Sequence, residues 1–386
     1  MNVEKICFIT DRYPTTDYPV NTFLDQLVCQ FADMGVKCTV IAPCSPLLDK
    51  IKKNKYNPSE HWVRKTKKGA HIDVFCPKMP FVFGKKVAGI DFFKLYCKVF
   101  STAVQKAFQK YTIDADVFYA HFVLPAGFAA SDIAQKYKKP YFIAYGESSI
   151  DIIRNKYNLE YVRKKLANIS GVIAVSTKNK EELIVNNVAP EEKVSIFPNA
   201  IDTSSFYPID QSIARKELGI SESCFVVAFV GHYIHRKGTL RLSKAIDKLN
   251  EVNSFFIGAG DEQPDCEGIL FAGRLPHEDV VKYLNAADVF VLPTLAEGCC
   301  NAIVEAMACG LPIISSDLPF NDDILDDSNS IRVDPNNIDE IADAIKRLQD
   351  DQQLRQKLSQ NAFRKAESLS IDKRAQAIYR FMITNT

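Results

Sequence analysis

The sequence of 386 residues lacks a long apolar run, because no stretch approaches the roughly 18 residues that a helix needs to cross a bilayer. A signal-peptide pattern is also absent, since the short run ICFIT after Glu4 and Lys5 is closed by Asp11 and Arg12. The 11 cysteines are an odd number without a C-x-x-C pair, which argues against a disulfide framework or a zinc site. We therefore expect a cytoplasmic protein in a reducing compartment.

An excess of charge of one sign is absent as well, since the formal net charge is only +1. However, residues 1–199 carry 29 Lys+Arg and 19 Asp+Glu, a net +10, and residues 200–386 carry 19 and 28, a net −9. The basic clusters lie at 50–55, 64–68, 85–86 and 163–165. They favour an anionic partner, either phospholipid headgroups at the inner face of a membrane or a phosphorylated acceptor, although each cluster alone can be a solvated face. They lack interleaved aromatic stacking platforms, so we expect no nucleic-acid partner.

A complete dinucleotide-binding motif is missing too. The run GAG at 258–260 contains two glycines of G-x-G-x-x-G, but the third is absent and Pro264 follows where a helix would begin. The sequence therefore gives no support for a nicotinamide-dependent enzyme.

What is present is a regular alternation of short apolar runs with longer amphipathic stretches, which predicts parallel sheets covered on both faces. One such stretch, 22–35, predicts a helix that ends at Gly35. The predicted strands are Val3–Thr10, Lys37–Ala42, Val117–Phe122, Tyr141–Tyr145, Gly171–Ser176 and Val194–Pro198 in the first half, and Cys224–Gly231, Ser254–Gly258, Ile269–Gly273, Val289–Pro293, Pro312–Ser316 and Ser330–Val333 in the second.

The segment 197–208 interrupts this alternation with turn-forming residues, and we interpret it as the connection between two domains. The predicted fold class is α/β, with two doubly wound parallel-sheet (Rossmann-like) domains, 1–200 and 201–370, that face each other across a cleft. Such sheets bind ligands at the carboxyl ends of their strands, so we expect the site on loops that leave those ends.

The strongest single feature is the stretch EGCCNAIVEAMACGLP, residues 297–312. Pro293 ends a predicted strand, so Glu297 should lie in a loop before a helix that begins near Asn301, its predicted N-cap. A helix N-terminus presents free N–H groups and a partial positive charge to a phosphate. Glu305 follows about one turn inside the helix. Eight residues of helix span about 12 Å, a length that suits a nucleoside diphosphate sugar.

Glu297-x7-Glu305 followed by AMACGLPII resembles the retaining glycosyltransferases of family 4 (glycosyl transferases group 1), which have the GT-B fold. The resemblance covers nearly the whole chain. PNAID (198–202) is similar to the family's Pro-Asn-Gly-Val-Asp, and FIGAGDE, FAGRLPHEDVVKYLNAADVFVLPT and EAMACGLPIISSD follow in the family's order. It also implies that residues 371–386 form a helix that returns to the first domain.

The resemblance implies a donor site in the second domain. Glu305 would bind the ribose hydroxyls, Glu297 would hold the donor sugar, and Lys237 would neutralise the diphosphate leaving group. The family usually has an arginine where this chain has His232, so Arg236 or a protonated His232 would have to replace it. The further donor-binding residues that we expect are Gly231, Arg274, Leu275, Cys300, Asn301, Ala302 and Ile303.

The resemblance also implies an acceptor site in the first domain. His121 matches the family's histidine beside the reaction centre, although a core histidine at a strand end is the alternative. Asn21 lies where the family often has glycine, in the loop after the first strand. Gly146 and Glu147 are candidate acceptor contacts in a second loop.

The family's chemistry implies transfer with retention of the anomeric configuration and no required metal or other cofactor. A D-x-D element is absent, and the acidic run 321–327 predicts a solvated loop. We expect a hexosyltransferase that moves a sugar from a nucleoside diphosphate sugar to a glycan or lipid-linked acceptor in surface polysaccharide biosynthesis. A sugar-nucleotide epimerase, a phosphorylase of the same fold and a catalytically silent GT-B partner protein are the alternatives.

Overall fold

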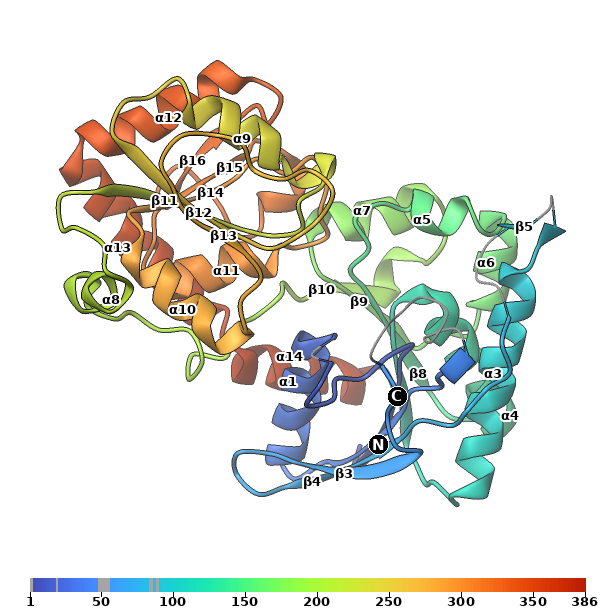
Figure 1. Ribbon diagram of the computed structural model, residues 1–386. Coiled ribbons are helices and arrows are strands. Elements are labelled where there is room, and N and C mark those ends of the chain that lie inside the picture. Colours follow the sequence, from blue (N-terminus) through green and yellow to red (C-terminus); the bar gives the residue numbers. More distant parts are fainter. Residues whose placement is uncertain (1–2, 19, 48–55, 83–85, 88–89) are drawn as a thin grey trace. The chain divides into compact units, whose positions relative to one another are not determined.

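The computed structural model describes residues 3–18, 20–47, 56–82, 86–87 and 90–386 (Figure 1). The predicted basic cluster at 50–55, and Lys85 of the cluster at 85–86, lie outside these residues. The chain divides into two compact units, which we call unit 1 (Met1–Phe197 with Arg374–Thr386) and unit 2 (Pro198–Lys373).

Unit 1 is built on a sheet of eight strands in the order β10-β9-β8-β7-β1-β2-β4-β3. All neighbours are parallel except β3 and β4, which form an antiparallel edge pair. The six strands predicted for this half are confirmed, and the β3–β4 pair was missed. The strands are β1 (Lys5–Ile9), β2 (Lys37–Ile41), β3 (His61–Lys65), β4 (His71–Phe75), β7 (Val117–His121), β8 (Tyr141–Tyr145), β9 (Gly171–Ala174) and β10 (Val194–Ile196), with a separate short pair, β5 (Lys86–Val87) and β6 (Ile90–Asp91).

The helices of unit 1 bury apolar stripes against this sheet. α1 directs Leu24, Leu27 and Phe31 inward, and the chain leaves it through Gly35 at φ +89°, which confirms the predicted helix end. In α14, Tyr379 donates to the carbonyl oxygen of Val3 over 2.8 Å. The helices are α1 (Thr22–Asp33), α3 (Phe93–Lys110), α4 (Phe128–Tyr137), α5 (Asp151–Arg154), α6 (Leu159–Lys165), α7 (Thr177–Val185) and α14 (Ile371–Thr384), whose first residues belong to unit 2.

Unit 2 contains a six-stranded, wholly parallel sheet in the order β13-β12-β11-β14-β15-β16. The six strands predicted for this half are confirmed. They are β11 (Phe225–Val230), β12 (Val252–Ile257), β13 (Ile269–Gly273), β14 (Val289–Leu292), β15 (Ile313–Ser316) and β16 (Ser330–Val333). The helices are α8 (Gln211–Leu218), α9 (Thr239–Ile246), α10 (His277–Ala286), α11 (Asn301–Ala308), α12 (Ile338–Asp350) and α13 (Gln352–Ser368).

The strand order of each unit reverses direction at one place. In unit 2 the first strand of the unit, β11, lies between β12 and β14, and in unit 1 the first strand, β1, lies between β2 and β7. The loops that leave the carboxyl ends of two strands at such a reversal diverge and leave room for a ligand. This topology selects the loops after β11 and β14 in unit 2, and those after β1 and β7 in unit 1, as candidate sites.

In the described ranges, no helix is both long and apolar enough to cross a bilayer.

Candidate active site

Glu297 is the centre of a cluster of charged side chains at the reversal of the unit 2 sheet. It lies in the loop between β14 and α11, and its Oε1 atom is 2.7 Å from Lys237 Nζ and 2.7 Å from Arg236 Nη1. The hydroxyl of Thr294 donates to the same oxygen over 2.9 Å. The Glu297 and Lys237 side chains are only 12% and 11% exposed. Lys237 and Glu297 are thus largely desolvated, whereas the second cation, Arg236, is 35% exposed.

Arg236 and Lys237 both lie in the loop after β11. This loop ends in a 3-10 turn, His235–Lys237, and Gly238 follows at φ +82°. A Cβ on Gly238 would lie 2.6 Å from the carbonyl oxygen of Pro293, so only glycine allows this loop to pack on the loop after β14. The amide of Leu295 completes the contact by donating to Arg236 O over 2.8 Å. Burial by itself would lower the pKa of Lys237, but the Cys300 sulfur and the Glu297 carboxylate raise it above its usual value, so the ammonium stays charged.

The two glycines of the run at 258–260 have a packing role. A Cβ on Gly258 would lie 1.8 Å from Gly231 O, and one on Gly260 would lie 2.2 Å from Tyr233 O. The buried Tyr233 ring runs under this contact, and its hydroxyl donates to Phe256 O and accepts from the Gly273 amide. These glycines therefore let the loop after β12 support the loop that carries Lys237.

The N-terminus of α11 lies beside Lys237. The helix begins at Asn301, as predicted for its start, but its N-cap is Cys300, so the prediction of Asn301 as N-cap was wrong. Cys300 has the extended backbone of an N-cap (φ −84°, ψ 111°), and its sulfur lies 3.9 Å from Lys237 Nζ. The Asn301 Oδ1 atom is buried without a hydrogen-bond partner among the described residues. Ala302 and Ile303 form the first turn with it.

Glu305 contacts a residue that was not predicted from the sequence to belong to the site. Its Oε1 atom is 3.1 Å from Nε2 of His277, the first residue of α10. The imidazole packs edge-on against Phe206, with ring centroids 5.0 Å apart. The hydrogen bond to Glu305 raises the pKa of His277 against the opposing effect of burial. The one feature of the sequence that could have indicated His277 as a site residue is its place at the start of a helix that follows a predicted strand.

Of the other predicted donor residues, Gly231 borders the Glu297 cluster, since a Cβ added to it would lie 3.6 Å from Lys237 Cδ. His232 is exposed, and Arg236 rather than His232 forms the second ion pair with Glu297. Arg274 and Leu275 follow the carboxyl end of β13, where Arg274 is exposed. Gly231 directly follows β11 and lies against Gly258.

His121 is the last residue of β7, at the reversal of the unit 1 sheet. Its ring lies 5.0 Å from that of Phe23 and 4.2 Å from that of Phe122. Both ring nitrogens are buried, and neither has a hydrogen-bond partner in the part of the chain that the structure describes. Burial, with a smaller contribution from Arg374, lowers the pKa of His121 to about 3, so the imidazole is neutral at pH 7.

Asn21 lies across from β7, in the loop after β1. Its backbone is left-handed (φ 52°, ψ 38°), a conformation that favours glycine and that asparagine tolerates better than most residues. Its Nδ2 atom donates to Arg12 O over 3.0 Å, which closes the loop directly before α1. The asparagine therefore fits the backbone that a glycine would otherwise provide.

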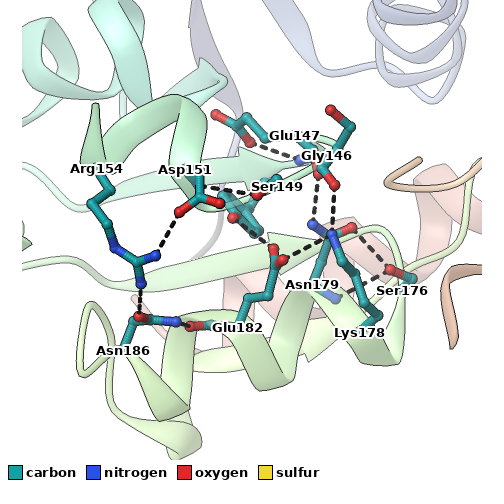
Figure 2. A network of polar contacts seen from close by, with 12 residues as sticks. Gly146, Glu147, Ser149, Asp151, Arg154, Ser176, Lys178, Asn179, Glu182 and Asn186 are labelled. Atoms are coloured by element: carbon teal, nitrogen blue, oxygen red, sulfur yellow. Dashed lines mark hydrogen bonds and ion pairs between the residues drawn. The ribbon is translucent and has the colours of Figure 1, made fainter. Parts of the chain in front are cut away.

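Glu147 connects the loops that leave β7 and β8, and Figure 2 shows its contacts on the β8 side, with Gly146 and Asn179. Its two carboxylate oxygens accept from the amides of Val123 and Gly146, each over 3.1 Å. Its own carbonyl oxygen accepts from Asn179 Nδ2 over 2.9 Å. Burial raises the pKa of Glu147 to about 7 against the lowering effect of the backbone amides. The side chain that we expected to contact an acceptor is thus turned to the backbone beside His121.

Among the residues with described positions, no group of three or more His, Cys, Asp or Glu side chains is arranged to hold a metal ion. The run 321–327 differs from the predicted solvated loop, because Asn321, Ile324 and Leu325 are buried while Asp322 is exposed. The amide of the Asn321 side chain donates to Ser316 O over 2.8 Å, which ties the segment to β15.

Comparison with known families gives two matches, which together extend over most of the chain. The model described as "Glycosyltransferase Family 4" matches residues 20–205, and the one described as "Glycosyl transferases group 1" matches residues 210–365. TuaC of Bacillus subtilis, named for teichuronic acid biosynthesis, is 27% identical over 362 residues, which are 90% of each chain. A galactosyltransferase of Escherichia coli that is named for a diphosphoundecaprenol acceptor is 30% identical over 203 residues, 47% of this chain and 52% of its own.

Solved structures show the same fold at low sequence identity. Sucrose-phosphate synthase from Thermosynechococcus elongatus has a TM-score of 0.77 at 19% identity and covers 99% of this chain and 100% of its own. HepE of Anabaena, in complex with UDP, has a TM-score of 0.74 at 16% identity. Its match covers 98% of this chain and 100% of the HepE chain. Two doubly wound units, matches to both family models and these neighbours agree: the chain has the GT-B fold and belongs to the glycosyltransferases of family 4, the glycosyl transferases group 1.

Proposed function

We propose that this glycosyltransferase moves a sugar from a nucleoside diphosphate sugar to a glycan or lipid-linked acceptor, with retention of the anomeric configuration and without a metal ion. The observation that carries the proposal is the Glu297 cluster. Lys237 and Arg236 converge there on one carboxylate oxygen, beside the N-terminus of α11. A diphosphate that entered this position would meet two cations and the free amides of a helix.

In this proposal the donor rearranges the Glu297 cluster. The diphosphate would take over Lys237 and Arg236, so Glu297 would be released to accept from hydroxyls of the sugar. Charge that develops on the leaving diphosphate would then be stabilised by groups that are already oriented and partly desolvated. Metal-independent transfer is consistent with this arrangement, since the protein itself supplies the positive charge.

The ribose would lie at the other end of the donor, on Glu305. His277 fixes one Glu305 oxygen, which leaves the second oxygen to accept from a ribose hydroxyl. His277 would thereby act as a positioning residue for the donor.

The acceptor side is proposed to include His121 in unit 1. A neutral imidazole has one donor and one acceptor nitrogen, and its two unpartnered nitrogens are suited to sugar hydroxyls. Glu147 would contribute by holding the loop after β7, and Asn21 by holding the loop after β1, at the opposite side of the same sheet reversal.

A lipid-linked or surface-polysaccharide acceptor is supported by the names of the relatives. TuaC is named for teichuronic acid biosynthesis, and the E. coli relative for a sugar on diphosphoundecaprenol. The basic first half suits such an acceptor at an anionic membrane surface. UDP is one candidate donor nucleotide, since HepE is described with UDP and with UDP-glucose.

The test combines a donor panel with two matched variants. Wild-type protein is incubated with UDP-, GDP- and ADP-sugars and acceptor lipid in excess EDTA, and products are followed by NMR of the anomeric proton. Retained configuration and EDTA-resistant transfer are expected from wild type and from E278Q, an exposed glutamate on α10. E305Q should lose most of the donor affinity. Inverted product, an epimerised free donor, or equal activity of E305Q and E278Q would contradict the proposal.

A further inference from the structure

A groove lies in unit 1 along the outward side of α3, and none of its lining residues belongs to the sites described above. Its volume is about 690 Å³, and it runs between α3 and the segment 77–80. The floor and walls are largely apolar. The apolar lining residues are Pro77, Met79, Pro80, Leu95, Val99, Ala103, Ala107 and Tyr111.

Lysines surround this apolar groove. α3 contains Lys94, Lys98, Lys106 and Lys110 and no acidic residue. Lys110 is paired with Glu60, but Lys98 and Lys106 are exposed and have no ion-pair partner within the described ranges. An unneutralised positive charge next to an apolar surface fits a ligand that is itself anionic and apolar.

A second groove of about 410 Å³ lies on the other side of α3 and shares Lys98 with the first. Its wall includes Tyr157 and Tyr161, whose rings stack with centroids 5.5 Å apart. Tyr161 is 51% exposed, and Leu95, which lines the first groove, is 47% exposed. Exposed tyrosine and leucine side chains flanked by lysines are typical of surfaces that enter the headgroup region of a membrane.

The outward side of α3 is not needed to hold the core. Cys97, Phe100, Val104 and Phe108 are buried, and α3 packs beside α4 (Figure 1). Leu95, Lys98 and Lys106 lie on the remaining side and contribute little to that packing.

We propose that the α3 groove docks unit 1 on a bilayer that contains anionic phospholipid. The phosphate of one lipid lies between Lys98 and Lys106, and its acyl chain, together with Leu95, covers the apolar floor. The choice of occupant follows from charge complementarity, since the groove combines two free lysines with an apolar floor that a soluble anion would leave uncovered. This inference deepens the proposed function, because it gives a transferase with a lipid-linked acceptor a place to meet that lipid.

The experiment measures binding to extruded vesicles by flotation at low salt. Wild type should bind vesicles of phosphatidylcholine mixed with phosphatidylglycerol and not vesicles of phosphatidylcholine alone. K98E/K106E should lose about 25-fold or more in apparent affinity, because each lysine near an anionic leaflet contributes about fivefold. L95E should also lose affinity. This variant tests whether the apolar side chain of Leu95 inserts into the bilayer in addition to the attraction between the lysines and the anionic lipid.

The matched control is K65E/K68E, which makes the same change of charge at two exposed lysines in β3 and the turn after it; they belong to the basic cluster at 64–68, to which this inference assigns no membrane contact. It should bind anionic vesicles like wild type. Equal loss in both double variants would show unspecific charge attraction and overturn the inference, and so would unchanged binding of L95E. Displacement by inorganic pyrophosphate at constant ionic strength would identify a site for a soluble anion, and a dimer in sedimentation that only K98E/K106E dissolves would identify a second copy as the occupant. Either result would overturn the proposal.

Donor hydrolysis without acceptor is followed in the same preparations. K98E/K106E and L95E should hydrolyse donor like wild type, which also verifies that they are folded. If vesicle binding fails while hydrolysis persists, the α3 groove inference is wrong and the proposed function stands.

Discussion

At the scale of single residues, Lys237 is the side chain on which donor binding depends most. It is nearly buried, charged and within 2.7 Å of Glu297, so its ammonium is fixed before a ligand arrives. We expect K237A to lower kcat/KM for the donor by about 10²–10³-fold, as for the loss of one preorganised charge at a leaving group. K244A, at an exposed lysine of α9, is the control and should behave like wild type in the same steady-state assay. Equal kinetics of the two variants would exclude Lys237 from the diphosphate site.

His277 gives a second prediction at this scale. If it acts only by fixing Glu305, H277A should raise KM for the donor about tenfold and change kcat little, since the ribose is bound equally in ground and transition states. H277Q keeps a donor to the carboxylate and should restore much of the affinity. A fall in kcat with unchanged KM would contradict a positioning role.

The same pair makes stability depend on pH. The pKa of folded His277 is raised, so the stability from its charged form is fully present below the unfolded pKa of about 6.5 and is lost as pH rises through the folded value. The excess stability of wild type over H277A should therefore decrease on going from about pH 6 to about pH 8.5. Urea unfolding of both proteins at each pH measures it.

At the scale of elements, the contact between the loops after β11 and β12 is the most restrictive in the donor site. G258A would place a Cβ 1.8 Å from Gly231 O, which requires the two loops to separate. We expect a loss of at least about 3 kcal/mol in the free energy of unfolding, as in other overpacked or strained sites. G219A, which has φ +69° and no atom within 4 Å of the added Cβ, should lose only about 1 kcal/mol. Equal losses in urea unfolding would refute the packing role of Gly258.

Glu147 couples the ends of β7 and β8, and its contribution to stability also falls as pH rises, but over a lower pH range than that of His277. Its folded pKa of about 7 lies above the usual 4.5, so the native state holds more protons between these values and loses stability as pH rises through this window. E147Q cannot titrate. The free energy of unfolding of wild type relative to E147Q should fall by roughly 1–3 kcal/mol between about pH 4.5 and about pH 8. A pH-independent difference in urea unfolding would show that the pKa of Glu147 is not raised in the folded protein.

The strands that could be predicted from the sequence were those that are buried on both faces, because burial makes their sequences continuously apolar. Val117–His121 and Val289–Leu292 are almost continuously buried, and such runs between helical patterns indicate parallel strands. β3, with the exposed and charged sequence HWVRK, lacks this pattern because it is an edge strand stabilised by pairing with β4. The start of α11 was predicted correctly, but its cap was not, because which residue is the N-cap depends on the path of the preceding loop.

The candidate site could be predicted in part. The sequence motif identified Glu297, Glu305 and Lys237, and the structure places Lys237 against Glu297. The contact of His277 with Glu305 joins residues 28 apart on different helices, and no local pattern encodes such a pairing. The orientation of the Glu147 side chain toward backbone amides could not be predicted for the same reason. Its partner Val123 lies 24 residues away, in the loop after the neighbouring strand.

At the scale of the whole molecule, alternation of strands and helices predicts two doubly wound units, and each unit has a strand reversal with the expected residues around it. The charge asymmetry of the sequence favoured an anionic partner but could not locate it. The side of α3 that gathers Leu95, Lys98 and Lys106 exists only once the helix has packed its opposite side on the core.

The most direct measurement is a crystal structure of the protein with a bound nucleoside diphosphate sugar. The account predicts diphosphate oxygens within hydrogen-bond distance of Lys237 Nζ and of the first amides of α11, with the ribose hydroxyls on Glu305. A diphosphate bound elsewhere, with the Lys237–Glu297 ion pair intact, would contradict it.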